Sequence, residues 1–147
     1  MNSADKAMAV MRRQVRAADE IALVNKRAYS MFRAMSVRAI EDGKAEQIDF
    51  TVEDIRKAAR EAIHFPCRWC ERIITAKNFS LDHKTPICRG GSYQGFNLRI
   101  ICSVCNGQKG SLIEDEFRAL RAFLVTITVE AKADVLRRLG LGARWRS

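Results

Sequence analysis

The 147-residue sequence predicts an α+β fold that is mostly helical. Three observations lead to this fold class. Apolar residues recur at steps of three and four in both terminal parts of the chain, which is typical of amphipathic helices. Between them, residues 67–101 have an irregular or extended pattern and are bracketed by two Cys-x-x-Cys pairs. The composition suits a folded domain, because 48% of the residues are hydrophobic and 29% are charged.

The first predicted element is one long helix, or two helices in line, from Ser3 to about Ile40. No glycine or proline occurs before Gly43. Apolar residues form a stripe along this stretch, and arginines and lysines fill much of the opposite face. The stripe consists of Met8, Met11, Val15, Ala18, Ile21, Val24, Ala28, Met31 and Met35. Such a stripe usually packs on the core of its own chain, although a helix this long can also pair with a second copy.

A second helix should follow the polar break at residues 43–49. Thr51 suits its N-cap, and Asp54 stands where it would complete a capping box. The helix should end before Pro66, because the residue before a proline disfavours helical backbone angles. His64 then falls in the last turn, where we expect it to pack or to compensate the helix dipole.

The middle of the chain is predicted to be irregular or extended. Short strands are expected at Ile73–Ile74 and Phe79–Leu81, and Gly90–Gly91 marks a loop. A helix is expected to begin near Ile100 and to run to Gly110.

Two more helices should complete the chain. Residues 111–127 have an amphipathic pattern whose apolar face consists of Leu112, Phe117, Leu120, Phe123, Leu124 and Ile127. The last helix, near Val129–Leu139, should end at Gly140, because glycine suits the residue after a helix. The expected organisation is a basic helical extension over residues 1–48, a central domain over 49–127, and a C-terminal helix with a basic tail over 128–147.

Positive charge is concentrated in the flanks of the chain. The formal net charge is +9, and the segments 1–40, 41–117 and 118–147 carry +5, −1 and +5. This excess favours a polyanionic partner, nucleic acid first and an anionic membrane surface second. No apolar run approaches the roughly 20 residues needed to cross a bilayer, and the N-terminus lacks a signal-peptide pattern. We therefore expect a cytoplasmic protein without a membrane partner, whose cysteines stay reduced.

Two Cys-x-x-Cys pairs, Cys67–Cys70 and Cys102–Cys105, predict a metal site. Each pair lets two thiolates reach one ion, and two pairs complete a tetrahedral Zn²⁺ site. Four thiolates leave no open position for water, so the zinc should be structural. The alternative is a chance grouping of buried thiols. Cys88 is left over, either as a small buried hydrophobe or as an oxidation-sensitive thiol near His83.

Five polar side chains stand between and beside the cysteine pairs: Asp82, His83, Asn97, Asn106 and Lys109. Asp82 and Asn106 offer oxygen donors that suit Mg²⁺, which prefers few protein ligands. His83 has a pKa in solution suited to accepting a proton from water. Adjacent strand residues point to opposite faces, so Asp82 and His83 can share a site only if the chain leaves strand geometry there. Each residue alone also has an ordinary explanation, as a turn former, a satisfied polar group or a helix cap.

The segments CRWC, LDHKTPICRGG and NLRIICSVCNGQKG, in this order, resemble the zinc-stapled HNH endonucleases that are common among bacteriophages. The resemblance covers about residues 50–125 and implies a ββα-metal fold. It implies that His83 is the general base and that Asn97 holds the histidine-bearing loop through backbone hydrogen bonds. Asn106 takes the third position, which makes this chain an H-N-N variant. Asp82 and Asn106 match the ligands of a catalytic Mg²⁺ or Mn²⁺, and Lys109 matches a lysine that contacts phosphate.

The implied activity is metal-dependent hydrolysis of DNA phosphodiester bonds, with 5′-phosphate and 3′-hydroxyl ends. The chain departs from the family pattern at three positions. Glu71 stands where many relatives have glycine, and Ile113 replaces a threonine helix cap. Asn106 replaces a histidine, which shifts the site toward hard, oxygen-liganding ions.

The basic flanks are the expected contacts to double-stranded DNA, because the central domain is nearly neutral. The candidates are Arg12, Arg13, Arg16, Arg89, Arg137, Arg138, Arg144, Trp145 and Arg146. A monomer with one site would nick one strand. A homodimer through the N-terminal helix could cut both.

Two rival functions fit the same sequence. One is a non-catalytic zinc module that binds nucleic acid or a partner protein, for instance within a phage packaging machine. The other is a nuclease that acts on RNA. If the chain is phage-encoded, the host cytoplasm is the expected location.

Overall fold

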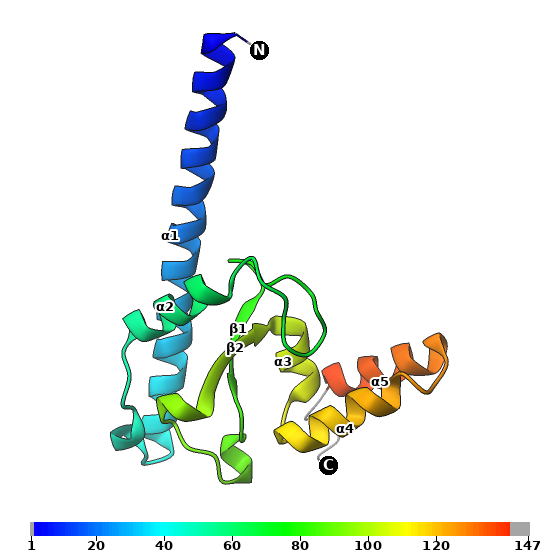
Figure 1. The fold of residues 1–147 in the computed structure, drawn as a ribbon. Helices are drawn as coiled ribbons and strands as arrows, with labels where there is room; N and C mark the ends of the chain where they lie inside the picture. The colour runs from blue at the N-terminus through cyan, green and yellow to red at the C-terminus, as the bar shows by residue number, and fades with distance from the viewer. Residues whose placement is uncertain (1, 142–147) are drawn as a thin grey trace.

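The long N-terminal helix α1 (Ser3–Glu41) dominates the shape of the protein, whose computed structural model describes residues 2–141 (Figure 1). Asn2 and Asp5 form a capping box at its start, and Asp42 is its C-cap. The other elements are α2 (Val52–Ala62), β1 (Phe79–His83), β2 (Leu98–Cys102), α3 (Ser103–Lys109), α4 (Glu114–Leu124) and α5 (Val129–Leu141), with 3₁₀ turns at Ala45–Gln47, Ile87–Arg89 and Gly95–Asn97. A single helix at the N-terminus is thus confirmed.

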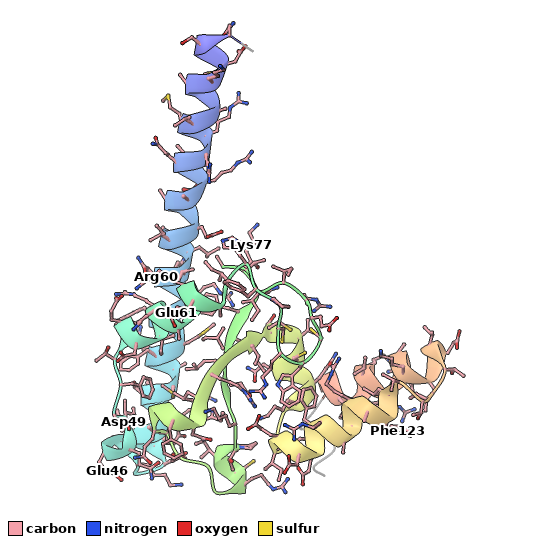
Figure 2. All side chains as sticks on the ribbon, viewed as in Figure 1. Glu46, Asp49, Arg60, Glu61, Lys77 and Phe123 are labelled. Carbon is pink, nitrogen blue, oxygen red and sulfur yellow. The ribbon has the colours of Figure 1, made fainter. Side chains whose placement is uncertain are left out.

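The two halves of α1 lie in different surroundings. Its second half packs on the core through Val24, Ala28, Met35 and Ala39. Residues 3–19 of this helix are exposed and project away from the other elements (Figures 1 and 2). The apolar stripe therefore packs on its own chain only in the second half. In the first half Met8, Met11 and Val15 are 53%, 64% and 58% exposed.

Helix α2 begins as its sequence predicts, with reciprocal hydrogen bonds between Thr51 and Asp54. His64, however, lies beyond the helix at a left-handed φ of 72°. The prediction that it belongs to the last turn is wrong, because its backbone N–H already pairs with the Ile74 carbonyl. Its ring Nε2 lies 2.9 Å from Glu20 Oε1 on α1.

Strands β1 and β2 form an antiparallel hairpin that runs from the pair Phe79–Cys102 to the pair His83–Leu98. The predicted strand at Phe79–Leu81 is confirmed and continues through His83. The predicted helix start near Ile100 is wrong, because the β-branched pair Ile100–Ile101 extends β2 as far as Cys102. The predicted strand at Ile73–Ile74 is also wrong, since only an isolated bridge joins Ile73 to Pro66.

Helix α5 packs against α3, and α4 connects the two along the chain (Figure 1). Helix α5 continues to Leu141, so the prediction that it ends at Gly140 is wrong. A glycine inside a helix costs only about 1 kcal/mol, which neighbouring residues can offset. The predicted DNA contacts Arg144, Trp145 and Arg146 lie outside the described residues.

One main hydrophobic cluster joins the elements. It contains Val24 of α1, Ala59 of α2, Phe79 of β1, Ile101 of β2 and Phe117 of α4. Arg27 adds a polar link from α1 to β1, because its Nη2 donates to the Phe79 carbonyl at 2.8 Å. The hairpin followed by α3 is the two-strand, one-helix unit expected from the sequence, so the α+β, mostly helical fold class is confirmed. Within residues 2–141 no helix combines the length and apolar character required to cross a membrane.

Candidate active site

The four cysteines of the two Cys-x-x-Cys pairs meet at one point. Their Sγ atoms all lie within 4.8 Å of one another, and those of Cys70 and Cys102 are 3.6 Å apart. A tetrahedral zinc ion with Zn–S bonds of about 2.3 Å would separate its sulfurs by about 3.8 Å. The residues present therefore fit a closed four-thiolate site for a metal such as zinc.

Local backbone geometry presents these thiols. In the first pair, the Glu71 N–H donates to the Cys67 carbonyl at 3.0 Å, and the Cys67 N–H donates to the Arg72 carbonyl at 2.8 Å. Glu71 adopts a left-handed φ of 61° to close this turn. In the second pair, Cys102 is the N-cap of α3, and its sulfur accepts from the Cys105 N–H at 3.4 Å.

Burial and hydrogen bonding act in opposite directions on the thiols. Burial raises the pKa of Cys102 and Cys105, because a thiolate there loses its contact with water. Burial also opposes ionisation of Cys67, but backbone N–H groups, among them that of Cys102, outweigh it and lower its pKa. A cation among the four sulfurs would favour the thiolate form of all of them.

Asp82 and His83 both lie within β1 and both line one cavity of about 760 Å³. The prediction that the chain must leave strand geometry here is wrong. His83 is the last residue of the strand, and it lines the same cavity as Asp82. Asn106 of α3 lines the same cavity, so three of the predicted site residues come together.

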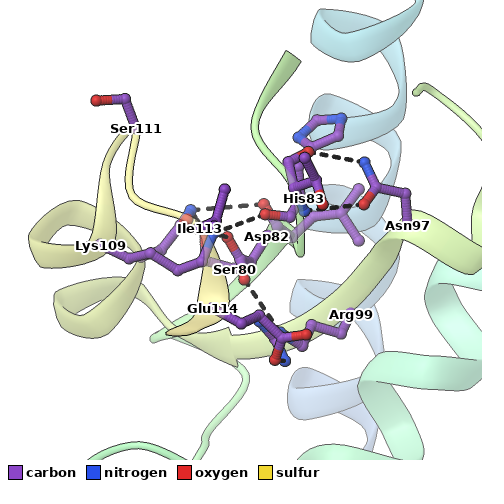
Figure 3. Close-up of polar contacts among 12 residues, drawn as sticks. Ser80, Asp82, His83, Asn97, Arg99, Lys109, Ser111, Ile113 and Glu114 are labelled. Carbon is purple, nitrogen blue, oxygen red and sulfur yellow. Dashed lines mark hydrogen bonds and ion pairs between the residues drawn. The ribbon is translucent and has the colours of Figure 1, made fainter. Parts of the chain in front are cut away.

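Asp82 is buried and its carboxylate is held by two cations (Figure 3). Its Oδ1 accepts from Lys109 Nζ at 3.0 Å, and its Oδ2 accepts from Arg99 Nε at 3.0 Å. Arg99 is the cross-strand partner of Asp82 and also pairs with Glu114. Lys109 also donates to the His83 carbonyl at 2.7 Å, and its side chain is completely shielded from solvent.

The His83 imidazole is prepared to accept a proton. Within the described part of the chain its Nε2 is buried and has no hydrogen-bond partner. Burial is the main cause that lowers the pKa of His83. The positive charges of Arg38 and Lys109 lower this pKa as well, whereas the negative charge of Asp82 raises it. A lowered pKa favours the neutral form of the ring, which can accept a proton. It also packs edge-on against Tyr93, with ring centroids 5.7 Å apart.

Asn97 joins the two ends of the loop that follows His83 (Figure 3). Its Oδ1 accepts from the Thr85 N–H at 2.9 Å, and its Nδ2 donates to the Thr85 and Ser92 carbonyls at 2.9 and 2.8 Å. The loop also requires Gly91, since a Cβ there would lie 1.9 Å from the Thr85 carbonyl oxygen. Gly90 has space for a Cβ, but its φ of 86° lies in the left-handed region that favours glycine.

Asn106 is oriented by the strand beside it. Its Nδ2 donates to Ser80 Oγ at 2.6 Å, and among the described residues no hydrogen bond engages its Oδ1. Each oxygen of Asp82 accepts one hydrogen bond and so retains a second lone pair. The donor set at the cavity thus fits a hard divalent cation, with Lys109 and Arg99 as competing positive charges on Asp82.

The predicted DNA contacts are spread over several surfaces rather than gathered at the cavity. Arg12, Arg13 and Arg16 are exposed on the projecting half of α1. The Arg89 guanidinium pairs with Glu116 through contacts of 2.9 and 3.1 Å. Arg137 and Arg138 both pair with Asp134 on α5.

Four residues at or next to the cavity escaped the sequence analysis: Arg38, Asp42, Tyr93 and Arg99. Arg99 could have been found only from the register of the hairpin, which no local pattern defines. Arg38 and Asp42 lie far from the motif in sequence. Burial, together with the hydrogen bond of 2.6 Å that the Tyr93 hydroxyl donates to Asp42, raises the pKa of Tyr93 to about 12.

Comparison with known proteins agrees with this geometry. A family model described as HNH endonuclease matches residues 67–120, which contain both cysteine pairs and the whole hairpin with α3. A search of the curated proteins finds no match to the chain. The segment from residue 67 to residue 120 is a member of the HNH endonuclease family.

Proposed function

We propose that this protein is a metal-dependent endonuclease that hydrolyses phosphodiester bonds of double-stranded DNA. The observation that carries the proposal is the neutral His83, whose buried Nε2 has no partner within residues 2–141, beside Asp82 and Asn106 in one cavity. A base that lacks a hydrogen-bond partner is available to a reacting water. The resemblance to the bacteriophage branch of the family supports a phage origin and action in the host cytoplasm.

The reaction follows from these side chains. His83 takes a proton from a water molecule, and the water oxygen attacks phosphorus in line with the 3′ oxygen. The bond between phosphorus and the 3′ oxygen breaks, the 3′ oxygen takes a proton from solvent, and a 5′-phosphate remains. Asp82 and Asn106 would hold Mg²⁺ or Mn²⁺, which supplies positive charge to the phosphate and to the leaving oxygen. Asn97 keeps the loop after His83 in place.

The test is nicking of a supercoiled plasmid in Mg²⁺ or Mn²⁺. The chain offers a matched control, because it contains two histidines and His64 lies outside the cavity. We expect His83→Ala to lose at least about 100-fold in rate, the usual minimum for a general base. His64→Ala should cut like the wild type. Equal cleavage by wild type and His83→Ala would overturn the mechanism.

A specific observation favours a second candidate, a non-catalytic zinc module. Both oxygens of Asp82 are engaged by side-chain cations, which is also the expected state of a purely structural carboxylate. Such a module would bind nucleic acid or a phage packaging partner and cut nothing. Absence of nicking by the wild type with either metal would select it. A panel of RNA and single-stranded substrates tests the RNA alternative in the same assay.

The exposed half of α1 supports two further parts of the proposal. Arg12, Arg13 and Arg16 would contact DNA phosphates, which makes binding steeply dependent on salt. One active site cuts one strand, so a second copy paired through Met8, Met11 and Val15 would deliver the second cut. Sedimentation of the intact chain at micromolar concentration tests this pairing, and a monomer there would contradict it.

A further inference from the structure

Part of the active-site cavity is built by a helix outside the matched family segment. The second half of α1 and its C-cap contribute Ser30, Met31, Ala34, Met35, Arg38 and Asp42 to the lining of the cavity. The family match begins at residue 67. The cavity that contains Asp82, His83 and Asn106 is therefore completed by the N-terminal extension.

Arg38 is the residue of this wall with a charge suited to the substrate. Its guanidinium takes part in no ion pair among residues 2–141, and its Nε makes only a long hydrogen bond of 3.4 Å to the Ala34 carbonyl. The two other cations near the cavity, Arg99 and Lys109, are already committed to Asp82. Arg38 and His83 line the same cavity.

Packing fixes the part of α1 that carries Arg38. Met35 and Ala39, which flank it, are buried in a cluster with Tyr93. The Tyr93 hydroxyl donates to Asp42 at 2.6 Å, and the Tyr93 ring meets the His83 ring at an interplanar angle of 89°. The loop behind the general base and the turn of α1 behind Arg38 are thus parts of one rigid unit.

We propose that Arg38 is a catalytic residue of this nuclease and binds the two non-bridging oxygens of the scissile phosphate. A guanidinium offers two parallel N–H donors that match two phosphate oxygens. Negative charge grows on these oxygens as water attacks, and a fixed cation beside them stabilises the transition state more than the bound substrate. This role rests on the proposed endonuclease function.

The experiment compares initial rates of plasmid nicking over a range of DNA concentrations, which gives both kcat and KM, for four full-length proteins: wild type, Arg38→Gln, Arg38→Lys and Arg33→Ala. Arg33 is an exposed arginine of the same helix that does not line the cavity, so its substitution controls for loss of one positive charge. We expect kcat to fall about 100-fold in Arg38→Gln, as when one transition-state donor is removed. Lysine should restore part of the rate. KM should change less than about threefold, because the contact forms mainly in the transition state.

Three outcomes would overturn the role of Arg38. The first is wild-type kcat in Arg38→Gln while His83→Ala is inactive, which leaves the endonuclease function intact. The second is an equal loss of kcat in Arg33→Ala and Arg38→Gln, which points to a general effect of charge. The third is absence of nicking by the wild type, which also overturns the endonuclease function. A melting temperature of Arg38→Gln within about 2 °C of the wild type, together with the loss of kcat, supports the role.

Discussion

At the scale of single residues, the centre of the site depends on a charge in the interior. The ammonium group of Lys109 is shielded from solvent and lies 3.0 Å from an oxygen of Asp82, which is 3% exposed. A buried ion pair adds little net stability, but removing one partner leaves the other charged and unpaired. Asp82 therefore has a structural role as the partner of Lys109, besides its proposed role as a metal ligand. Loss of activity in a variant of Asp82 alone would not distinguish these two roles.

Substitution of Lys109 by methionine should lower the free energy of unfolding by about 3 kcal/mol. The cause is the buried carboxylate of Asp82, which would retain only Arg99 as a cationic partner. Urea denaturation of the zinc-loaded protein measures it. The matched control is Arg137→Met, which breaks a surface pair with Asp134 and should cost less than about 1 kcal/mol. Equal, small losses in both variants would contradict the importance of the buried pair.

Gly91→Ala should disrupt the loop after His83. The new methyl group would overlap the Thr85 carbonyl oxygen, and Thr85 is the residue that Asn97 holds. We expect stability to fall by more than about 2 kcal/mol and nicking to be lost, with zinc still bound. Gly107→Ala is the control for stability, because nothing lies within 4 Å of its Cβ position and alanine favours a helix. Unchanged nicking in Gly91→Ala would argue against a fixed loop.

The His83 ring should titrate below the ordinary histidine value of about 6.5. Burial disfavours its charged form, so between the folded and unfolded pKa values the unfolded state binds more protons. This group therefore makes stability rise as pH increases through that window and level off above it. Nuclear magnetic resonance of the zinc-loaded protein without Mg²⁺ follows both histidine rings, and His83→Ala assigns them. A midpoint for His83 above 6.5 would show that burial does not dominate.

At the scale of elements, the turn that carries the first cysteine pair has a strained backbone. Glu71 closes this turn in the left-handed region, which costs an L-residue roughly 1 kcal/mol and glycine almost nothing. The same position is one of those where the sequence departs from the family pattern. Glutamate at position 71 therefore has a conformational cost relative to glycine, and this cost can be measured as a change in stability.

Glu71→Gly should stabilise the protein by about 0.5–1 kcal/mol, since relief of strain exceeds the added freedom of the unfolded chain. Glu61→Gly makes the same chemical change inside helix α2, where it should destabilise by about 1 kcal/mol. Thermal melting of the two variants gives opposite shifts if backbone geometry decides the result. A lower melting temperature for Glu71→Gly would show that its side chain matters more than its φ.

At the scale of the whole molecule, the metal site and the hydrophobic core are the same region. Cys67, Cys102 and Cys105 belong to the cluster that also contains Val24 of α1 and Phe117 of α4. Whatever binds the four thiols therefore joins elements from both ends of the described chain.

Removal of zinc should abolish cooperative melting of the core. Structural zinc contributes about 10 kcal/mol or more, which is comparable with the whole stability of a domain. Chelation followed by calorimetry measures this, and Cys70→Ser should reproduce it. Cys88→Ser is the control, because Cys88 is exposed and does not belong to the four-sulfur group. A cooperative transition that survives chelation would mean that the thiols pack without metal.

The sequence predicted those parts of the structure that local signals define. The cysteine spacing, the capping box at Thr51 and the start and length of α1 are all local in this sense. The contacts that decide the site are not: Arg99 meets Asp82 across a hairpin, and Arg38 reaches the cavity from a helix 45 residues before His83. The pairing register and the packing of α1 bring them together, and neither leaves a pattern in the sequence.

The unbroken course of α1 also gives the molecule a measure of length. Arg38 follows Arg16 by 22 positions along the helix, and a rise of 1.5 Å per position places them about 33 Å apart. This nearly equals one turn of B-form DNA, about 34 Å. A duplex laid along the helix would present the same groove to both arginines, one turn apart. The length of α1 would then set the distance along the duplex between the phosphate that Arg16 contacts and the phosphate that is cut.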